Sequence, residues 1–264
     1  DGRTYYNAHA WVKADSEMAL AHLDDDPETD PFTLLEGKTS CHTGWLKSAG
    51  MLLPMGYLIG NEYAPVIGDG DDIESLRNTI YGFFNSDASI PDSGTPYYSY
   101  SGAVKCLSDG TGDVAFAKDS TIDSYCGNEV SEDNEDWCLE RDQYVALPTF
   151  GQAPSHPIMY NPESLDVQTR TAILNALMTL NYETYIENYT VMGDTYTGCY
   201  DISVHVIDED SPKNTCGSEI LENVLNTPGL VRVTSQEHMG SYSELISNIP
   251  GISSYYSDKF DIED

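Results

Sequence analysis

The chain has 264 residues, of which 44 are acidic and 12 are basic, so its formal net charge is −32. A charge of this sign and size repels nucleic acid and anionic membrane surfaces and excludes both as partners. Hydrophobic residues make up 40% and aromatic residues 11%, which excludes a disordered chain and allows one large domain or two smaller ones.

The first half of the chain is predicted to alternate strands with helices. Residues 4–13 place every second apolar side chain on one face, which predicts a strand, and an acidic loop is expected to follow through residue 30. Helical spacing predicts a helix over 72–84 and a shorter one over 101–108. A compact apolar run over 113–117 predicts a buried strand of the parallel type. This alternation favours an α/β fold.

The second half of the chain is predicted to continue the same pattern. A long helix is expected to be capped by Asn161 and Pro162, to reach Leu180 and to support the core. The other predicted elements are strands over 142–148, 158–160, 202–207 and 230–234 and a final helix over 241–248.

Six cysteines indicate where the protein is located. They form no CxxC pair, so the spacing of a zinc knuckle or a thioredoxin-type motif is absent, and their even number favours disulfides in an oxidising compartment. Short separations suggest the pairs Cys126 with Cys138 and Cys199 with Cys216. A glycosylation sequon at 188–190 agrees with secretion. We therefore expect an extracellular protein, and the longest nearly apolar run is too short to span a bilayer.

Two segments place reactive side chains beside predicted helix starts. Residues 40–50, SCHTGWLKSAG, set the hydroxyl of Thr43 and the cation of Lys47 before small residues that can begin a helix. Free N–H groups at a helix start attract an anion, which a hydroxyl and a cation help to neutralise. Residues 100–107, YSGAVKCL, set Tyr100 on a glycine turn at another helix start. The first segment predicts anion binding and the second predicts an oriented phenol.

These segments have a family resemblance. With residues 152–156, QAPSH, and the pair Tyr5-Tyr6, they resemble the iron-binding lobe of transferrins in the same chain order, over residues 1–160. The single lobe, the acidic surface and Lys47 look most like the phytotransferrins of marine algae. The resemblance implies an α/β fold of the periplasmic-binding-protein type, with two subdomains, mixed sheets flanked by helices and a cleft between the subdomains.

The resemblance also implies how the chain is divided. Residues 10–150 would form the second subdomain of the lobe, whereas residues 1–9 and 151–264 would form a crossing strand and the remainder of the first subdomain. The strands that cross between the subdomains would lie over 5–13 and 149–156.

The ligands implied by the resemblance are Fe(III) and a synergistic carbonate. Tyr5, Tyr100 and His156 would bind the metal, and Fe(III) is a hard ion that prefers phenolate and carboxylate oxygens and tolerates imidazole. Metal binding must then remove the phenol protons, which titrate near pH 10 in free tyrosine.

The carbonate pocket of the family corresponds to one segment of this chain. Thr43, Lys47 and the backbone amides of Ala49 and Gly50 would hold the anion, and a disulfide between Cys41 and Cys106 is implied nearby. Arginine usually stands where this chain has Lys47. Lysine keeps the charge but lacks the planar fork of arginine, so we expect the anion to be held more loosely or through water.

Two other positions depart from the family pattern. The carboxylate ligand of transferrins lies well before the Tyr-Tyr strand, so we expect a preceding segment to be absent from this sequence or to exist as another piece. Lys118-Asp119 stands where a lysine-histidine pair is common in the family. We therefore do not expect acid to open the lobe through that pair.

The leading interpretation is iron uptake or sequestration at the cell surface. A cell-surface receptor and a membrane anchor outside this sequence are both considered as partners. The main alternative is a metal-free oxyanion-binding protein, for phosphate or phosphonate, with the same fold and pocket. A third is a metal-free adhesion or receptor ectodomain. The motifs Gly-x-Ser-x-Gly, His-Glu-x-x-His and the Walker loop are absent, so we do not expect an enzyme.

Overall fold

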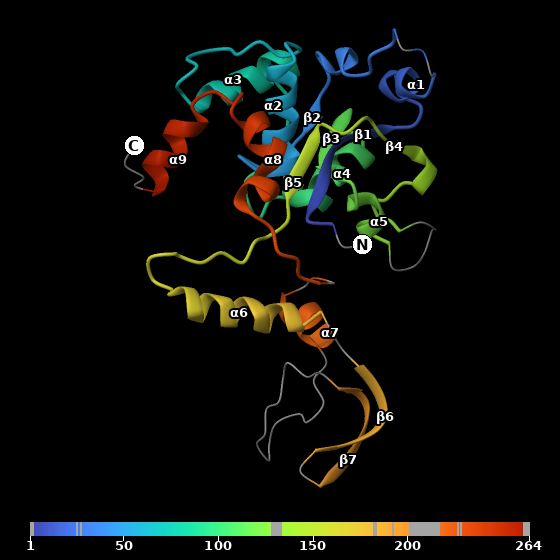
Figure 1. Ribbon diagram of the computed structural model, residues 1–264. Coiled ribbons are helices and arrows are strands. Elements are labelled where there is room, and N and C mark those ends of the chain that lie inside the picture. The colour runs from blue at the N-terminus through green and yellow to red at the C-terminus, as the bar shows by residue number, and fades with distance from the viewer. Residues whose placement is uncertain are drawn as a thin grey trace. The chain divides into compact units, whose positions relative to one another are not determined.

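The computed structural model describes residues 3–24, 26, 28–127, 134–181, 184–191, 193–200, 217–225, 227 and 229–260 (Figure 1). The chain forms two compact units. The larger unit contains Tyr5–Ser155 and Gln236–Asp264, and the smaller unit contains Asp1–Thr4 and His156–Ser235. The subdomain division expected from the sequence, with boundaries near residues 9 and 150, stays a prediction.

The larger unit contains a five-stranded sheet with the strand order β2-β3-β1-β4, in which β5 also pairs with β1. Its strands are β1 (Tyr5–Lys13), β2 (Ser40–Cys41), β3 (Val114–Lys118), β4 (Tyr144–Ala146) and β5 (Gly151–Pro154). The long strand β1 is antiparallel to β3, β4 and β5, whereas β2 is parallel to β3. The strands predicted over 4–13, 113–117 and 142–148 are confirmed, although β3 is parallel to only one of its two neighbours.

Alternation along β1 divides the core of the larger unit into two clusters. Ala8, Ala10 and Val12 are fully buried on one face, in a cluster with the apolar residues of η2 (Ser48–Leu52) and α2 (Leu53–Gly60). Trp11 belongs to the other cluster, with apolar residues of α4 (Ser99–Ser108). Helices therefore flank the sheet, and the predicted mixed α/β class is confirmed (Figure 1).

Further helices surround this sheet. They are α1 (Glu17–Leu23), η1 (Thr33–Leu35), α3 (Glu74–Phe83), α5 (Thr121–Tyr125), η3 (Arg141–Gln143), α8 (Ser235–Ile246) and α9 (Ile252–Phe260). Helices α3 and α4 confirm the helices predicted over 72–84 and 101–108. Helix α8 covers most of the helix predicted over 241–248 and is kinked at Gly240, where φ is 36°. That helix is not the final one, because α9 follows it.

Helix α1 corrects the prediction of an acidic loop through residue 30. The Ser16 hydroxyl accepts a hydrogen bond from the Ala19 N–H at 3.2 Å and so caps the helix. Met18, Ala19 and Ala21 are buried beneath it. Glu17, which begins the helix, is exposed, and the apolar side of the helix is short.

The smaller unit contains a helix and a hairpin. Its elements are α6 (Val167–Thr179), the antiparallel pair β6 (Thr184–Val191) and β7 (Asp194–Tyr200), α7 (Gly217–Ile220) and η4 (Leu221–Leu225). Asp166 caps α6 by accepting hydrogen bonds from the N–H groups of Gln168 and Thr169 at 2.8 and 2.9 Å. The cap predicted at Asn161 and Pro162 is therefore placed too early.

Several predictions for the smaller unit are wrong. No residue of α6 is buried, so α6 does not support a core as expected. Residues 158–160 and 230–234 form no strands, and Ile158 and Met159 are exposed. At the start of the second run, the Leu230 N–H instead donates to the Asn181 side chain at 2.8 Å, and that side chain donates to the Leu230 carbonyl at 2.6 Å. The strand predicted over 202–207 lies outside the described residues.

Two disulfides confirm two of the predicted cysteine pairs. Cys41 is bonded to Cys106, which joins the end of β2 to α4, and Cys126 is bonded to Cys138. The pair suggested for Cys199 cannot be compared, because Cys216 lies outside the described residues. Within the part of the chain that the structure describes, no helix has both the length and the apolar character needed to cross a membrane.

Candidate anion and metal site

The anion segment of the sequence brings Thr43 against a helix start. Thr43 lies two residues after the end of β2 and is 2% exposed, and its Oγ1 has no hydrogen-bond partner within the described structure. A Cβ atom added to Gly50 would lie 1.9 Å from that Oγ1. Only glycine leaves room for the hydroxyl there. A buried hydroxyl without a partner is costly, so this atom is suited to a ligand that completes its hydrogen bonding.

The helix start beside Thr43 has an unusual geometry. In η2 the Leu52 N–H donates to the Lys47 carbonyl at 3.0 Å and the Leu53 N–H donates to the Ser48 carbonyl, which is the wide π-type pattern. No side chain caps this start. The amides of the first turn, including those of Ala49 and Gly50, thus lie at the positive end of η2 and α2. Single π turns occur often at functional sites.

His42 supports this turn from the buried side. Its Nδ1–H donates to the Gly50 carbonyl at 2.9 Å, and its Nε2 accepts from the Ser40 hydroxyl at 3.1 Å. The ring stacks on Phe116 with the centroids 5.0 Å apart. Burial lowers the pKa of His42 from 6.5 to about 4, partly offset by the bond to Gly50. His42 is therefore neutral at physiological pH and holds Gly50 without adding charge.

Lys47 lies at the exposed edge of the anion segment. Its Nζ is 5.5 Å from the ring centroid of Tyr98, a cation–π distance. The Tyr98 ring also covers Gly44, where an added Cβ would lie 2.8 Å from a ring carbon. Tyr98 thus packs on the loop that carries Lys47, which supports a structural role for this tyrosine.

Tyr100 lies in the first turn of α4, next to the anion segment. The Ser99 N–H donates to the Thr43 carbonyl at 2.9 Å, so the start of α4 is tied to the residue whose hydroxyl is unpartnered. Ser99 has a positive φ of 71°, an unfavourable backbone state for serine that is retained at this junction. The structure therefore brings together the two segments that carry Thr43 and Tyr100.

The surroundings of Tyr100 keep its phenol protonated in the absence of a metal. Burial raises the pKa of Tyr100 above its usual value, and the neighbouring Tyr6, through charge and a hydrogen bond, raises it further, with smaller effects of Tyr125 and Asp119. The Nζ of Lys118 is 5.4 Å from the ring centroid. A bound cation of high charge would have to displace this proton.

Tyr5 and Tyr6 differ in position on β1. Tyr5 is 36% exposed and pairs with Pro154 of β5 in the sheet. Successive side chains of a strand point to opposite faces, so Tyr6, which contacts Tyr100, lies on the other face. The structure thus places Tyr6 beside the phenol of Tyr100, and Tyr5 stays a predicted ligand.

His156 belongs to the smaller unit, whereas Tyr5 and Tyr100 belong to the larger one. Its role as a metal ligand together with the two tyrosines stays a prediction. Among the described residues, no group of three or more His, Cys, Asp or Glu side chains is arranged to hold a metal ion.

Three residues of this region were not predicted as part of the site. Ser40 and His42 lie in the anion segment itself. Their closeness to Thr43 in the sequence could have identified them as supporting residues. Tyr242 of α8 contacts the same turn, with its hydroxyl 3.0 Å from the Oγ of Ser48. It has no motif around it, so the sequence alone gives no signal for it.

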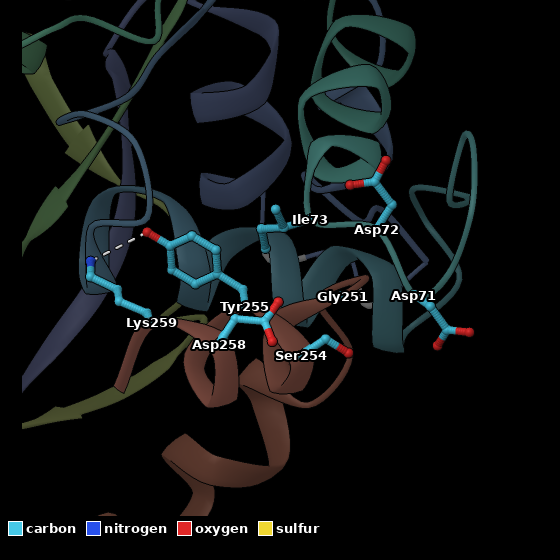
Figure 2. A pocket seen from close by; sticks show the side chains of 8 residues that line it. All are labelled: Asp71, Asp72, Ile73, Gly251, Ser254, Tyr255, Asp258 and Lys259. Atoms are coloured by element: carbon cyan, nitrogen blue, oxygen red, sulfur yellow. Dashed lines mark hydrogen bonds between the residues drawn. The ribbon is translucent and has the colours of Figure 1, made fainter. Parts of the chain in front are cut away.

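Figure 2 shows a pocket of about 350 Å³ that none of the predicted site residues line. It lies between α9 and the loop before α3, and Asp71, Asp72 and Asp258 give it three carboxylates. The Lys259 ammonium donates to the Tyr255 hydroxyl at 3.3 Å. The excess of carboxylates makes this pocket unsuited to an anion.

Comparison with known proteins identifies the family. Lactotransferrin of Desmodus rotundus is 34% identical over 168 residues, which cover 55% of this chain and 20% of that protein. Serotransferrin of Oryctolagus cuniculus is 35% identical over 163 residues, which cover 55% and 19%. Serotransferrin of Paralichthys olivaceus is 33% identical over 148 residues, which cover 47% and 21%. The chain thus matches about a fifth of the length of these relatives.

The structure of transferrin 1 from Manduca sexta is also similar, with a TM-score of 0.41 and 20% identity over 58% of this chain and 27% of that chain. The family model described as Transferrin matches residues 1–94 and 85–147, which is more than half of the 264 residues. The chain therefore belongs to the transferrin family.

Proposed function

We propose that the chain binds Fe(III) together with carbonate and serves iron uptake or sequestration at the cell surface. Membership of the transferrin family supports an iron-binding role. The single observation that carries the anion part of the proposal is the buried, unpartnered hydroxyl of Thr43 against Gly50. Both disulfides agree with an extracellular location.

The residues around Thr43 suit carbonate. The hydroxyl of Thr43 would donate to an anion oxygen, and the missing side chain of Gly50 leaves room for that hydroxyl. The amides of Ala49 and Gly50 and the charge of Lys47 would complete its neutralisation. Carbonate bound there would supply oxygen ligands to the metal.

The proposed metal ligands are Tyr5, Tyr100 and His156. Phenolate oxygens suit Fe(III), which is a hard acid. Because burial and Tyr6 raise the pKa of Tyr100, its phenol stays protonated until the ion binds. Loading should therefore release protons, and acidification should favour release of iron.

Absorption spectroscopy tests this function. We expect the 264-residue protein to develop a visible tyrosinate-to-iron absorption band when ferric nitrilotriacetate and bicarbonate are added together. Tyr100→Phe should lose the band because a phenolate ligand is gone, whereas Tyr98→Phe should keep it, because Tyr98 packs on Gly44 and Lys47. The two variants differ from the wild type by the same single hydroxyl.

Two results would contradict the proposal. The first is the absence of any bicarbonate-dependent band in the wild type. The second is an equal effect of the Tyr98 and Tyr100 substitutions. The metal-free oxyanion alternative uses the same hydroxyl and cation, and it would be favoured by phosphate binding without iron that Tyr100→Phe leaves unchanged.

A further inference from the structure

Tyr242 connects the C-terminal part of the chain to the proposed carbonate pocket. Its hydroxyl is 3.0 Å from the Oγ of Ser48, a residue 194 positions earlier in the sequence. Ser48 is the first residue of η2 and directly precedes Ala49 and Gly50. The family model matches residues only up to 147, so its match does not include Tyr242.

The packing of α8 fixes the position of Tyr242. Gly56 and Gly60 lie four residues apart on one side of α2, and a Cβ atom at either would collide with α8 or the residues after it. At Gly56 the obstacle is the Leu245 carbonyl, 2.2 Å away. The Asn248 side chain also donates to the Gly56 carbonyl at 3.0 Å. Helix α8 is therefore held in backbone contact with the helix that continues η2.

The turn that begins η2 is held at two points. On the buried side, His42 donates to the Gly50 carbonyl. On the opposite end of the turn, Tyr242 bonds to the Ser48 hydroxyl. The first N–H groups of a helix have no partner within it, so contacts from outside the turn influence where its first amides point.

The phenol of Tyr242 is suited to this contact beside an anion. Burial raises its pKa, the bond to Ser48 opposes this, and Tyr256 and Tyr6 raise it further. A neutral phenol adds no negative charge next to the pocket.

We propose that Tyr242 is a positioning residue of the carbonate pocket, which acts through Ser48 on the amides of Ala49 and Gly50. This inference rests on the proposed function. Tyr242 itself does not touch the anion in this assignment, so its removal changes the direction of the amides without removing any group that binds the anion.

Two measurements on Tyr242→Phe test the inference. Amide hydrogen exchange in the ligand-free protein should become faster across residues 48–52, because the turn loses its outer hydrogen bond. The apparent Kd for bicarbonate, measured through the iron absorption band, should rise by about threefold to tenfold, the size expected for one lost hydrogen bond. Phenylalanine keeps the ring, so the packing of α8 should be preserved.

Matched variants separate positioning from general damage. Ser48→Ala should reproduce both effects, and the double variant should be no worse than either single one, because both remove the same bond. Tyr255→Phe on α9 removes a hydroxyl that bonds Lys259 and should change neither measurement.

The outcomes distinguish this inference from the proposed function. A wild type that shows no bicarbonate-dependent loading contradicts the proposed function. Unchanged exchange over residues 48–52 in Tyr242→Phe overturns the inference whether or not bicarbonate binds. Additive effects of Tyr242→Phe and Ser48→Ala also overturn it, because the two hydroxyls would then act separately.

Discussion

At the scale of single residues, the contact between Thr43 and Gly50 decides whether the pocket can exist. In folded proteins a buried hydroxyl nearly always has a hydrogen-bond partner. Here the missing side chain at Gly50 leaves space for the hydroxyl. The cost of the unpartnered hydroxyl is consistent with a ligand that is bound in the working state.

Substitution of Gly50 by alanine should therefore abolish anion-dependent loading. The new methyl group would lie 1.9 Å from Thr43 Oγ1, so either the hydroxyl or the turn must move. We expect the free energy of unfolding to fall by about 1–3 kcal/mol, as for other overpacked sites. Urea unfolding and bicarbonate titration of the iron band would measure the two effects.

Gly70→Ala is the matched control for this experiment. No heavy atom lies within 4 Å of a Cβ placed at Gly70. It should therefore bind bicarbonate like the wild type. Retained bicarbonate dependence in Gly50→Ala would show that the Thr43 hydroxyl is not where the anion binds.

His42 makes stability depend on pH. Its pKa is about 4 in the folded protein and 6.5 in the unfolded chain, so the unfolded state binds the proton more readily. The titration of His42 should leave the free energy of unfolding nearly constant above pH 6.5 and should lower it as the pH drops toward 4. The full loss is about 3 kcal/mol, because each unit of pKa difference corresponds to about 1.4 kcal/mol.

Urea unfolding at several pH values between 7 and 4 would measure this loss. Carboxylates also titrate near the lower end of this range, so the informative quantity is the difference between the wild type and His42→Gln, which cannot titrate. The variant should be less stable at pH 7, because it loses the stacked ring. Its stability should also fall less steeply with acid, and parallel pH profiles would contradict the buried, neutral state of His42.

At the scale of elements, two separate connections hold the anion segment and the helix that carries Tyr100 together. The Cys41–Cys106 disulfide joins β2 to α4, and the Ser99 N–H bonds to the Thr43 carbonyl. Tyr242 adds α8 from a distant part of the sequence. The anion segment and the helix that carries Tyr100 thus form one connected assembly inside the larger unit.

The elements with strong periodic patterns were predictable from the sequence. The strand pattern of β1 and the helical spacing of α3 follow from where apolar side chains must point, and packing in the core confirms both. The motif also indicated a helix start beside Thr43, which the structure has. These predictions depend on local patterns only.

The remaining elements and contacts depend on long-range partners. Helix α1 was not predicted because it is short and lies among acidic residues, and the hairpin of β6 and β7 was not predicted either. The runs at 158–160 and 230–234 have the apolar pattern of short strands, but the structure forms no strand at either run. Tyr242 illustrates the same limit, since nothing in the sequence around it indicates a bond to Ser48.

At the scale of the whole molecule, the charge of −32 opposes the binding of any anion. A carbonate ion that approaches the protein meets a field of its own sign. The positive end of η2 and the ammonium of Lys47 offset this field only locally. The pocket therefore uses short-range groups, which salt screens less than it screens the distant carboxylates.

The same charge should make the protein more stable in salt. Acidic residues exceed basic ones by 32, so self-repulsion favours the expanded unfolded chain. Raising NaCl from about 0.01 M to about 0.1 M shortens the screening length from about 30 Å to about 10 Å, so the melting temperature at pH 7 should rise over this range. The rise should vanish near the pI of about 4.1, where the net charge approaches zero. A melting temperature at pH 7 that is constant or falls with added NaCl would mean that the carboxylates are arranged so that their repulsion is already offset in the folded state.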